Sequence, residues 1–120
     1  MLDKIEYLED GENRYPIAFT LNVMEAIQEE YETMQKWGEL IQNGAEPNIK
    51  ALKFVLLEMI NEGLEIEEKE EELMTSKQVG RLITRIGIKK SSEKVKRLIS
   101  QSMPEVEKSK NATTTKNPRA

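Results

Sequence analysis

Residues 49–62 read Ile-Lys-Ala-Leu-Lys-Phe-Val-Leu-Leu-Glu-Met-Ile-Asn-Glu and form the most hydrophobic stretch of the chain. Their apolar side chains recur at the spacing of one helix face, in a wide stripe made of Ile49, Leu52, Val55, Leu56, Met59 and Ile60. Asn48 is a favourable N-cap residue, and Gly63 is typical of a helix end. The sequence therefore predicts a central helix over about 49–62, against which the other elements pack.

The N-terminal residues have the pattern of a β-hairpin. A short β-rich run at 5–8 is followed by Asp10-Gly11, a pair that favours a tight turn. Beyond the turn, apolar side chains alternate at period two, at Tyr15, Ile17 and Phe19. We expect strands near 4–9 and 14–19. Pro16 cannot donate a ladder hydrogen bond, so the second strand should have a free edge or a bulge there.

Helical periodicity begins near residue 20 of the chain. Thr20 or Asn22 can cap the helix, with Glu25 as the capping-box partner of Asn22. Thr33, at a break in the pattern, can cap a second helix, which Asn43-Gly44 ends. The sequence thus predicts two consecutive helices between the hairpin and the central helix.

An acidic connector follows the central helix. Residues 62–72 hold seven glutamates and one lysine, which is typical of a solvated segment. Thr75 or Ser76 can start the next helix, and Gly87 ends it.

The last predicted helix starts at Ser91 or Ser92. Pro104 closes it, because a proline keeps the preceding residue out of helical angles. Residues 104–120 carry few apolar side chains and are expected to form a disordered tail. The predicted fold class is therefore α+β, mostly α: one domain over 1–103 with a short N-terminal β-hairpin followed by four or five helices, and a disordered C-terminal tail.

Composition limits the chemistry that is available. The 120-residue chain has no cysteine and no histidine, which excludes disulfides, thiolate metal sites and histidine general bases. The glutamates lie in hydrated runs rather than in a calcium-loop pattern, and no glycine-rich phosphate loop is present. We expect no enzymatic activity, no catalytic or metal-binding residue and no cofactor. The acidic N-terminus and the lack of a long apolar run predict a soluble intracellular protein that does not bind membranes.

Charge is distributed unevenly along the sequence. Residues 1–76 hold 6 basic and 19 acidic side chains, whereas residues 77–120 hold 12 basic and 3 acidic ones. Either the two parts attract each other within the fold, or the basic part meets an anionic partner. The sequence leaves both readings open.

A basic surface is expected on residues 75–101, where two predicted helices surround Gly87. Its candidate residues are Lys77, Arg81, Arg85, Lys89 and Lys90. One interpretation is a helix-turn-helix that binds DNA. The other is a helical hairpin that closes the core, with its cations in water. The second helix offers few residues that read bases in its first turn, so nucleic acid is the less favoured partner.

A second candidate surface surrounds the only tryptophan. Met34, Trp37, Leu40 and Ile41 form an apolar patch on a short predicted helix. The patch is either part of the core or a partner-binding surface, since tryptophan and methionine are enriched at interfaces.

The order of elements resembles a known family. The strand-to-helix junction reads Tyr-Pro-Ile-Ala-Phe-Thr-Leu-Asn-Val-Met-Glu-Ala-Ile-Gln-Glu-Glu-Tyr over 15–31, and Trp-Gly-Glu-Leu follows at 37–40. After the apolar helix and acidic connector, Thr-Ser-Lys-Gln-Val-Gly-Arg-Leu-Ile occupies 75–83. Over about 5–103 the chain is similar to the tail assembly chaperones of long-tailed phages and prophages, including related gene-transfer-agent proteins.

The resemblance implies a helical domain with a small hairpin and no enzymatic activity. Such proteins coat the tape-measure protein in the host cytoplasm until tail-tube subunits polymerise around it, and are absent from the mature virion. The resemblance also implies that a longer form with a C-terminal extension is made by a ribosomal frameshift in many members. Independently of the resemblance, the two oppositely charged regions favour head-to-tail self-association into a homo-oligomer. The alternative functions are a small phage DNA-binding regulator, with its helix-turn-helix at 75–101, and a structural component retained in the tail.

Overall fold

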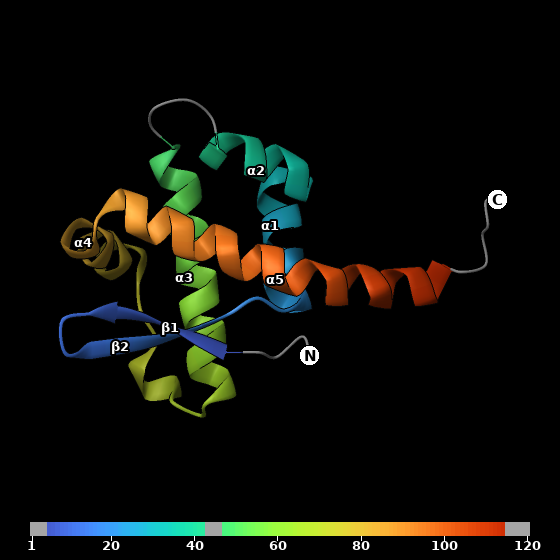
Figure 1. Ribbon diagram of the computed structural model, residues 1–120. Coiled ribbons are helices and arrows are strands. Elements are labelled where there is room, and N and C mark those ends of the chain that lie inside the picture. The colour runs from blue at the N-terminus through green and yellow to red at the C-terminus, as the bar shows by residue number, and fades with distance from the viewer. Residues whose placement is uncertain (1–4, 43–46, 115–120) are drawn as a thin grey trace.

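A computed structural model of the protein describes residues 5–42 and 47–114, with side chains as far as Met103. The chain forms a two-stranded antiparallel hairpin followed by helices, so the predicted α+β, mostly α fold is confirmed (Figure 1). The elements are β1 (Ile5–Asp10), β2 (Asn13–Ala18), α1 (Leu21–Tyr31), α2 (Met34–Gln42), α3 (Ile49–Ile66), the 3₁₀ turn η1 (Glu70–Glu72), α4 (Ser76–Ile86) and α5 (Ile88–Thr114). The division into a domain over 1–103 and a tail stays a prediction.

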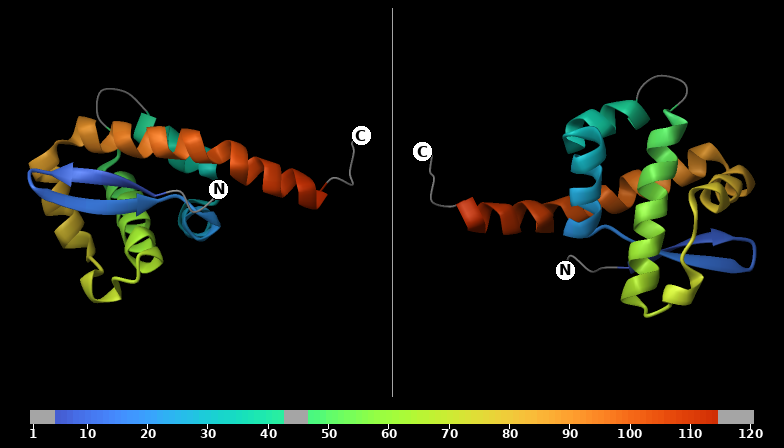
Figure 2. Two further views of the ribbon diagram at one scale, coloured as in Figure 1. Left: turned by 60° about the horizontal axis from the view of Figure 1, so that its bottom comes forward. Right: turned by 180° about the vertical axis from the view of Figure 1, so that it is seen from behind.

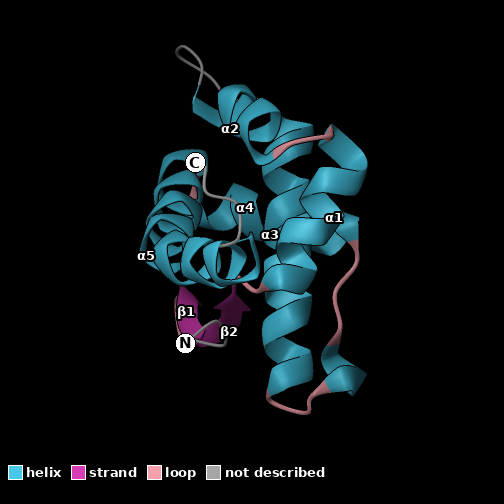
Figure 3. Cartoon of the chain, turned by 90° about the vertical axis from the view of Figure 1, so that its right-hand side faces the viewer, coloured by secondary structure: helices cyan, strands magenta, loops and turns pink. Residues whose placement is uncertain are grey.

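Helix α3 occupies the centre of the molecule, as its apolar stripe predicts. It lies between α1 on one side and α4 and α5 on the other, with the hairpin beside its C-terminal half (Figures 2 and 3). Its side chains Leu52, Val55, Leu56, Met59 and Ile60 are fully buried. The burial of this stripe is the main favourable contribution to folding, because apolar area is removed from water on both flanks of the helix.

The hairpin has a continuous one-to-one register. Asp10 pairs with Asn13 around Gly11, whose φ of 64° the turn requires, and Tyr7 pairs with Pro16. The bulge predicted at Pro16 is absent, and the outer edge of β2 pairs with no further strand among the described residues but is covered by α3. Pairs alternate between those that exchange hydrogen bonds and those that do not. The closing Asp10–Asn13 pair exchanges hydrogen bonds, so the Tyr7–Pro16 pair, three pairs away, does not. The Pro16 nitrogen therefore lies on the outer edge of β2, and its lack of an N–H group removes no hydrogen bond to β1.

Two of the predicted helix caps form as expected. The Thr33 hydroxyl accepts a hydrogen bond from the Lys36 amide at 3.0 Å, and the Asn48 side chain accepts one from the Ala51 amide at 3.0 Å. The predicted helix end at Asn43-Gly44 lies outside the described residues.

The first helix begins at one of the two predicted cap residues, but the predicted side-chain cap is absent. Thr20 is the N-cap of α1, but its side chain makes no cap bond. Its hydroxyl instead donates to Glu62 of α3 at 2.7 Å, and the Asn22 amide donates to the same carboxylate at 3.2 Å. A tertiary acceptor therefore replaces the local capping box that Asn22 and Glu25 would form.

The predicted stop of the central helix at Gly63 is also wrong, since α3 continues to Ile66. Gly63 is buried where β2 crosses the helix. A Cβ atom at this position would lie 2.7 Å from the Pro16 carbonyl oxygen. The glycine thus serves a close approach of helix and strand rather than a helix end.

Helix α4 starts as predicted, with a capping box between Thr75 and Gln78. The preceding residue is fixed from α3: the Asn61 side chain accepts from the Met74 amide at 2.8 Å and donates to its carbonyl at 3.0 Å. Gly87, with a φ of 108°, ends the helix. The start of α4 is therefore fixed to α3 through Asn61, and its end is set by Gly87.

The predicted bounds of the last helix are wrong at both ends. Helix α5 begins at Ile88, and the Ser91 amide donates to the Gly87 carbonyl at 3.1 Å. Ser91 and Ser92, the predicted caps, are buried within the helix. The helix also passes Pro104 and reaches Thr114, extending beyond the other elements (Figure 1). A proline removes one helix hydrogen bond, and the Glu- and Lys-rich residues after it favour helix.

Within the described parts of the chain, no helix combines the length and the apolar character that crossing a bilayer requires.

Candidate functional site

The apolar patch around Trp37 is part of the core. Trp37 and Ile41 are each 3% exposed, and the Trp37 indole nitrogen donates to the Ala51 carbonyl of α3 at 3.1 Å. Met34 and Leu40 are half-buried and pack against the same core. Of the two interpretations of this patch, the structure therefore supports the core, and these side chains do not form a free partner-binding surface. The apolar stripe of α2 is buried against α3.

The predicted basic residues are all exposed, but their surroundings differ. Lys77 and Arg81 lie on α4, and Lys89 lies at the start of α5. Arg85 forms an ion pair with Asp10 of β1 at 2.8 Å, and this hydrogen bond raises the pKa of the guanidinium. Lys90 lines a cleft between α5 and β1. These cations are close together in the sequence. In the fold, Arg85 and Lys90 lie beside β1, whereas the other three do not line this cleft.

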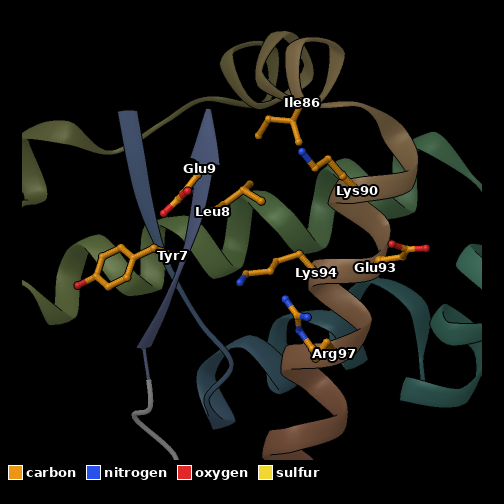
Figure 4. Close-up of a pocket in the computed structure, with 8 residues that line it drawn as sticks. All are labelled: Tyr7, Leu8, Glu9, Ile86, Lys90, Glu93, Lys94 and Arg97. Carbon is orange, nitrogen blue, oxygen red and sulfur yellow. The ribbon is translucent and has the colours of Figure 1, made fainter. Parts of the chain in front are cut away.

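The β1–α5 cleft has a volume of about 490 Å³. It is lined by Tyr7, Leu8 and Glu9 of β1, by Ile86 of α4, and by Lys90, Glu93, Lys94 and Arg97 of α5. Figure 4 shows Lys90, Lys94 and Arg97 directed from α5 toward β1, while Glu93 points away from the strand. The cleft therefore has a strand as one wall and a cationic helix face as the other.

Ion pairs join β1 to the two C-terminal helices. Lys94 of α5 lies 3.3 Å from Glu6, in addition to the pair between Arg85 and Asp10. Both acids come from the acidic part of the sequence and both cations from the basic part. This supports the reading in which the two charged regions attract each other within the fold.

The opposite face of β1 carries Tyr7, which points away from α5 (Figure 4). Its hydroxyl donates to Glu67 at the end of α3, and this hydrogen bond is the main cause of its raised pKa. The Arg14 guanidinium lies 4.1 Å from the ring centroid. Tyr7 thus ties the hairpin to the acidic connector and is not directed at a ligand.

An apolar groove crosses α3, α4 and the start of α5. It consists of two adjoining hollows of about 390 and 400 Å³ that share Ile49 and Lys53. The side chains that define it are Ile49, Phe54, Leu57, Ile83 and Ile88, with Lys50 and Lys53 beside them. Ile49 is 44% exposed and Ile88 is 43% exposed. The groove offers apolar surface to a partner, with cations at its rim.

Sequence reasoning missed the apolar groove. One signal was present: Phe54 and Leu57 widen the central stripe beyond the face that the core uses. Ile49 and Ile88 lie 39 positions apart in the sequence, and only the packing of α5 against α3 and α4 brings them to one hollow.

Among the residues that the structure describes, no group of three or more acidic side chains is arranged to hold a metal ion. Glu67 of the acidic connector is engaged by Tyr7 and lies 3.6 Å from Lys69. The absence of catalytic residues and cofactors stays a prediction from composition.

Comparison with known proteins does not assign a family. The resemblance to tail assembly chaperones stays a prediction from the sequence. No protein-family model, curated protein or solved structure matches this chain.

Proposed function

We propose that this protein is a phage tail assembly chaperone that binds an apolar helix of the tape-measure protein in the apolar groove. The observation that carries the proposal is the groove itself, where Ile49 and Ile88 remain exposed beside half-buried Phe54 and Leu57. Helix-in-groove binding requires a hydrophobic surface of this kind.

The cations beside the groove favour a particular client face. Lys50 and Lys53 line the hollows on the α3 side. They are placed to pair with acidic side chains that flank the apolar stripe of an amphipathic helix. Covering such a stripe prevents the client helices from associating with each other, because it removes the exposed apolar surface that drives aggregation.

In this proposal the chaperone acts by binding and not by chemistry. Tail-tube subunits displace it as they assemble around the tape-measure protein, so it acts in the host cytoplasm and does not remain in the mature virion. Several copies bind along one client, because the tape-measure protein is long and repeats its helical pattern. The proposal includes self-association between neighbouring copies along the client.

The test is co-expression with a phage tape-measure protein, measuring the soluble fraction of that client. Ile49→Asp and Ile88→Asp remove the exposed apolar groups of the groove. The matched control is Leu21→Asp, because Leu21 is 47% exposed and, like Ile49 and Ile88, is the first residue of its helix. An aspartate is well tolerated at that position, where it faces the positive end of the helix dipole.

We expect both groove variants to lose most of the client solubilisation and the control to retain it. Circular dichroism would verify that all three chains stay folded. If the groove variants solubilise the client as well as Leu21→Asp does, the assignment of the groove is wrong. If the wild-type chain does not change the solubility of the client, the chaperone function itself is wrong.

The second candidate function, a DNA-binding regulator, is favoured by the exposed cations on the two helices around Gly87. A duplex held by phosphate contacts loses affinity with salt at a log–log slope of about −0.9 per contact. A salt titration with a duplex probe therefore separates it from client binding in the apolar groove, which we expect to depend weakly on salt.

A further inference from the structure

Strand β1 has a free backbone edge. The sheet contains β1 and β2 alone among the described residues, and β2 pairs with one side of β1. In the alternating pattern set by the Asp10–Asn13 closing pair, Tyr7 and Glu9 belong to pairs that exchange no hydrogen bonds. Their N–H and C=O groups therefore point to the outer edge of β1, where a further strand can pair with them.

This free edge opens into the β1–α5 cleft. Three consecutive β1 residues, from Tyr7 to Glu9, line one wall, and α5 forms the other (Figure 4). The volume of about 490 Å³ lies within the range of ligand-binding pockets, which is about 300–1,000 Å³. Half-buried Ile86 adds apolar surface between the two walls, beside Leu8, which is buried in the core. A cleft between an edge strand and a helix is the geometry in which extended peptides bind by strand addition.

The helix wall of the cleft is cationic. Lys90, Lys94 and Arg97 follow one another at intervals of four and three positions, so they share one face of α5. All three point toward β1, whereas Glu93 and Glu9 point away from the space between the walls (Figure 4). Glu6 already pairs with Lys94 at 3.3 Å, which shows that a carboxylate on the strand side is within reach of this face.

We propose that the β1–α5 cleft binds an extended acidic segment of a partner protein as a third strand beside β1. The backbone of the segment pairs with the outward groups of Tyr7 and Glu9. Its carboxylates pair with Lys90, Lys94 and Arg97, and its alternate side chains contact Ile86. This site is separate from the apolar groove and does not depend on the function proposed for that groove.

Acidic segments are favoured over basic or neutral ones because of the helix wall. A carboxylate of the partner competes with Glu6 for Lys94, while Lys90 and Arg97, on either side of it, form no ion pair within the part of the chain that the structure describes. A basic segment would face three like charges at short range, which disfavours binding.

The experiment is an amide-resolved NMR titration of the full chain with a short blocked peptide of alternating glutamate and valine. We expect shifts that centre on the amides of Tyr7 and Glu9 and on the cationic face of α5. A lysine–valine peptide should not bind. The glutamate–valine peptide with alternate amides N-methylated should bind at least about tenfold more weakly, a loss of about 1.4 kcal/mol.

Charge-reversal variants test the helix wall. Arg97→Glu and Lys94→Glu should each weaken the acidic peptide at least about fivefold, since each replaces an attraction by a repulsion. The matched control is Lys89→Glu, which reverses an exposed cation at the start of α5 that does not line the cleft. Its affinity should change less than about twofold. Arg97→Glu keeps the test valid if Lys94→Glu loosens the fold by breaking the pair with Glu6.

A backbone variant tests the edge. Glu9→Pro removes an outward N–H that makes no bond to β2, and Pro16 shows that the hairpin accepts a proline at such a position. We expect folding to be kept and peptide binding to be lost.

Several outcomes would overturn the proposal. They are no binding of the acidic peptide, equal binding of the lysine peptide, shifts centred on Ile49 and Ile88, and full binding by Glu9→Pro. Concentration-dependent shifts of the β1 amides without peptide would also overturn it, because they would identify a second copy of this chain as the occupant.

Discussion

Gly63 lies where α3 and β2 approach each other closely, so the absence of a side chain at this position has a structural role. A methyl group there would lie 2.7 Å from the Pro16 carbonyl oxygen, so strand and helix would have to move apart. We predict that Gly63→Ala destabilises the fold by about 1–3 kcal/mol, the usual cost of overpacking a core. Urea denaturation followed by circular dichroism measures the change.

Gly38 supplies the matched control for this prediction. It lies within α2, and a Cβ atom there would have no neighbour within 4 Å. Gly38→Ala should therefore stabilise the fold by about 0.5–1 kcal/mol, because alanine loses less backbone entropy in a helix. Equal effects of the two substitutions would mean that the Gly63–Pro16 approach does not constrain the structure.

The ionisation of Glu58 should make the free energy of unfolding depend on pH, in a direction that follows from its pKa. Burial raises its pKa, and the neighbouring charges of Glu62 and Glu65 raise it further. A carboxyl whose pKa is higher in the folded than in the unfolded state destabilises the fold when ionised. This cost is fully present above the raised pKa and disappears as pH falls below the ordinary value of 4.5.

We therefore predict that Glu58→Gln raises the melting temperature at pH 7. The advantage should shrink as the pH falls through the raised pKa and vanish below pH 4. Thermal melts of both chains across this range measure it. A constant difference at every pH would show that the ionisation of Glu58 is not the cause.

Local contacts decided which residue roles the sequence could predict. Thr33 and Asn48 bond to amides three positions away, so their capping roles follow from the neighbouring residues. The partner of Thr20 is Glu62, which lies 42 positions along the chain. The role of Trp37 was left open for the same reason, since its indole partner belongs to α3. When the partner of a residue is distant in sequence, the role of that residue can be identified only from the folded structure.

At the scale of elements, the start of α4 is stabilised by a capping box, a local interaction whose contribution to stability can be measured. The Thr75 hydroxyl accepts from the Gln78 amide at 3.3 Å, and the Gln78 side chain accepts from the Thr75 amide at 2.8 Å. We predict that Thr75→Ala costs about 1 kcal/mol of stability, within the range of about 0.5–2 for N-cap residues.

The comparison variant is Ser76→Ala, at the alternative start that the sequence allowed. Ser76 is exposed and is not the cap, so its replacement should change stability by less than about 0.5 kcal/mol. Chemical denaturation of both variants gives the two values. A larger loss from Ser76→Ala than from Thr75→Ala would place the functional cap one residue later.

Elements were predictable where periodicity and turn chemistry agree. The hairpin around Gly11 and the central apolar helix have strong patterns, and both are confirmed. The bounds of α5 were not predictable, because Gly87 ends α4 and leads directly into the next helix. Pro104 was interpreted as a stop, but a single lost hydrogen bond does not end a helix that continues in residues of high helix propensity.

At the scale of the whole molecule, the charge asymmetry of the sequence acquires a structural meaning. The acidic hairpin is joined to the basic C-terminal helices by the Glu6–Lys94 and Asp10–Arg85 pairs. Ion pairs at the surface contribute little to stability because water screens them, so they orient the hairpin more than they stabilise it. Both the apolar groove and the β1–α5 cleft form between elements that are distant in sequence. Neither was predictable from the sequence for that reason.

The domain boundary predicted at residue 103 can be tested on the whole chain. The buried hydrophobic core extends from Leu8 to Leu98, and Met103 packs against it. The residues after it are mostly polar, so they bury little apolar area to offset the entropy of ordering them. We predict that a chain ending at Met103 unfolds cooperatively, with a free energy of unfolding within about 1 kcal/mol of the full chain.

A chain ending at Lys94 is the contrasting variant, because it removes Val95 and Leu98, both fully buried in the core. Deleting two such side chains costs well over about 2 kcal/mol each, which exceeds half of the stability of a small domain. We expect this chain to lose its cooperative transition in urea. If the chain ending at Met103 lost it as well, residues 104–120 would belong to the folded unit and the predicted boundary would be wrong.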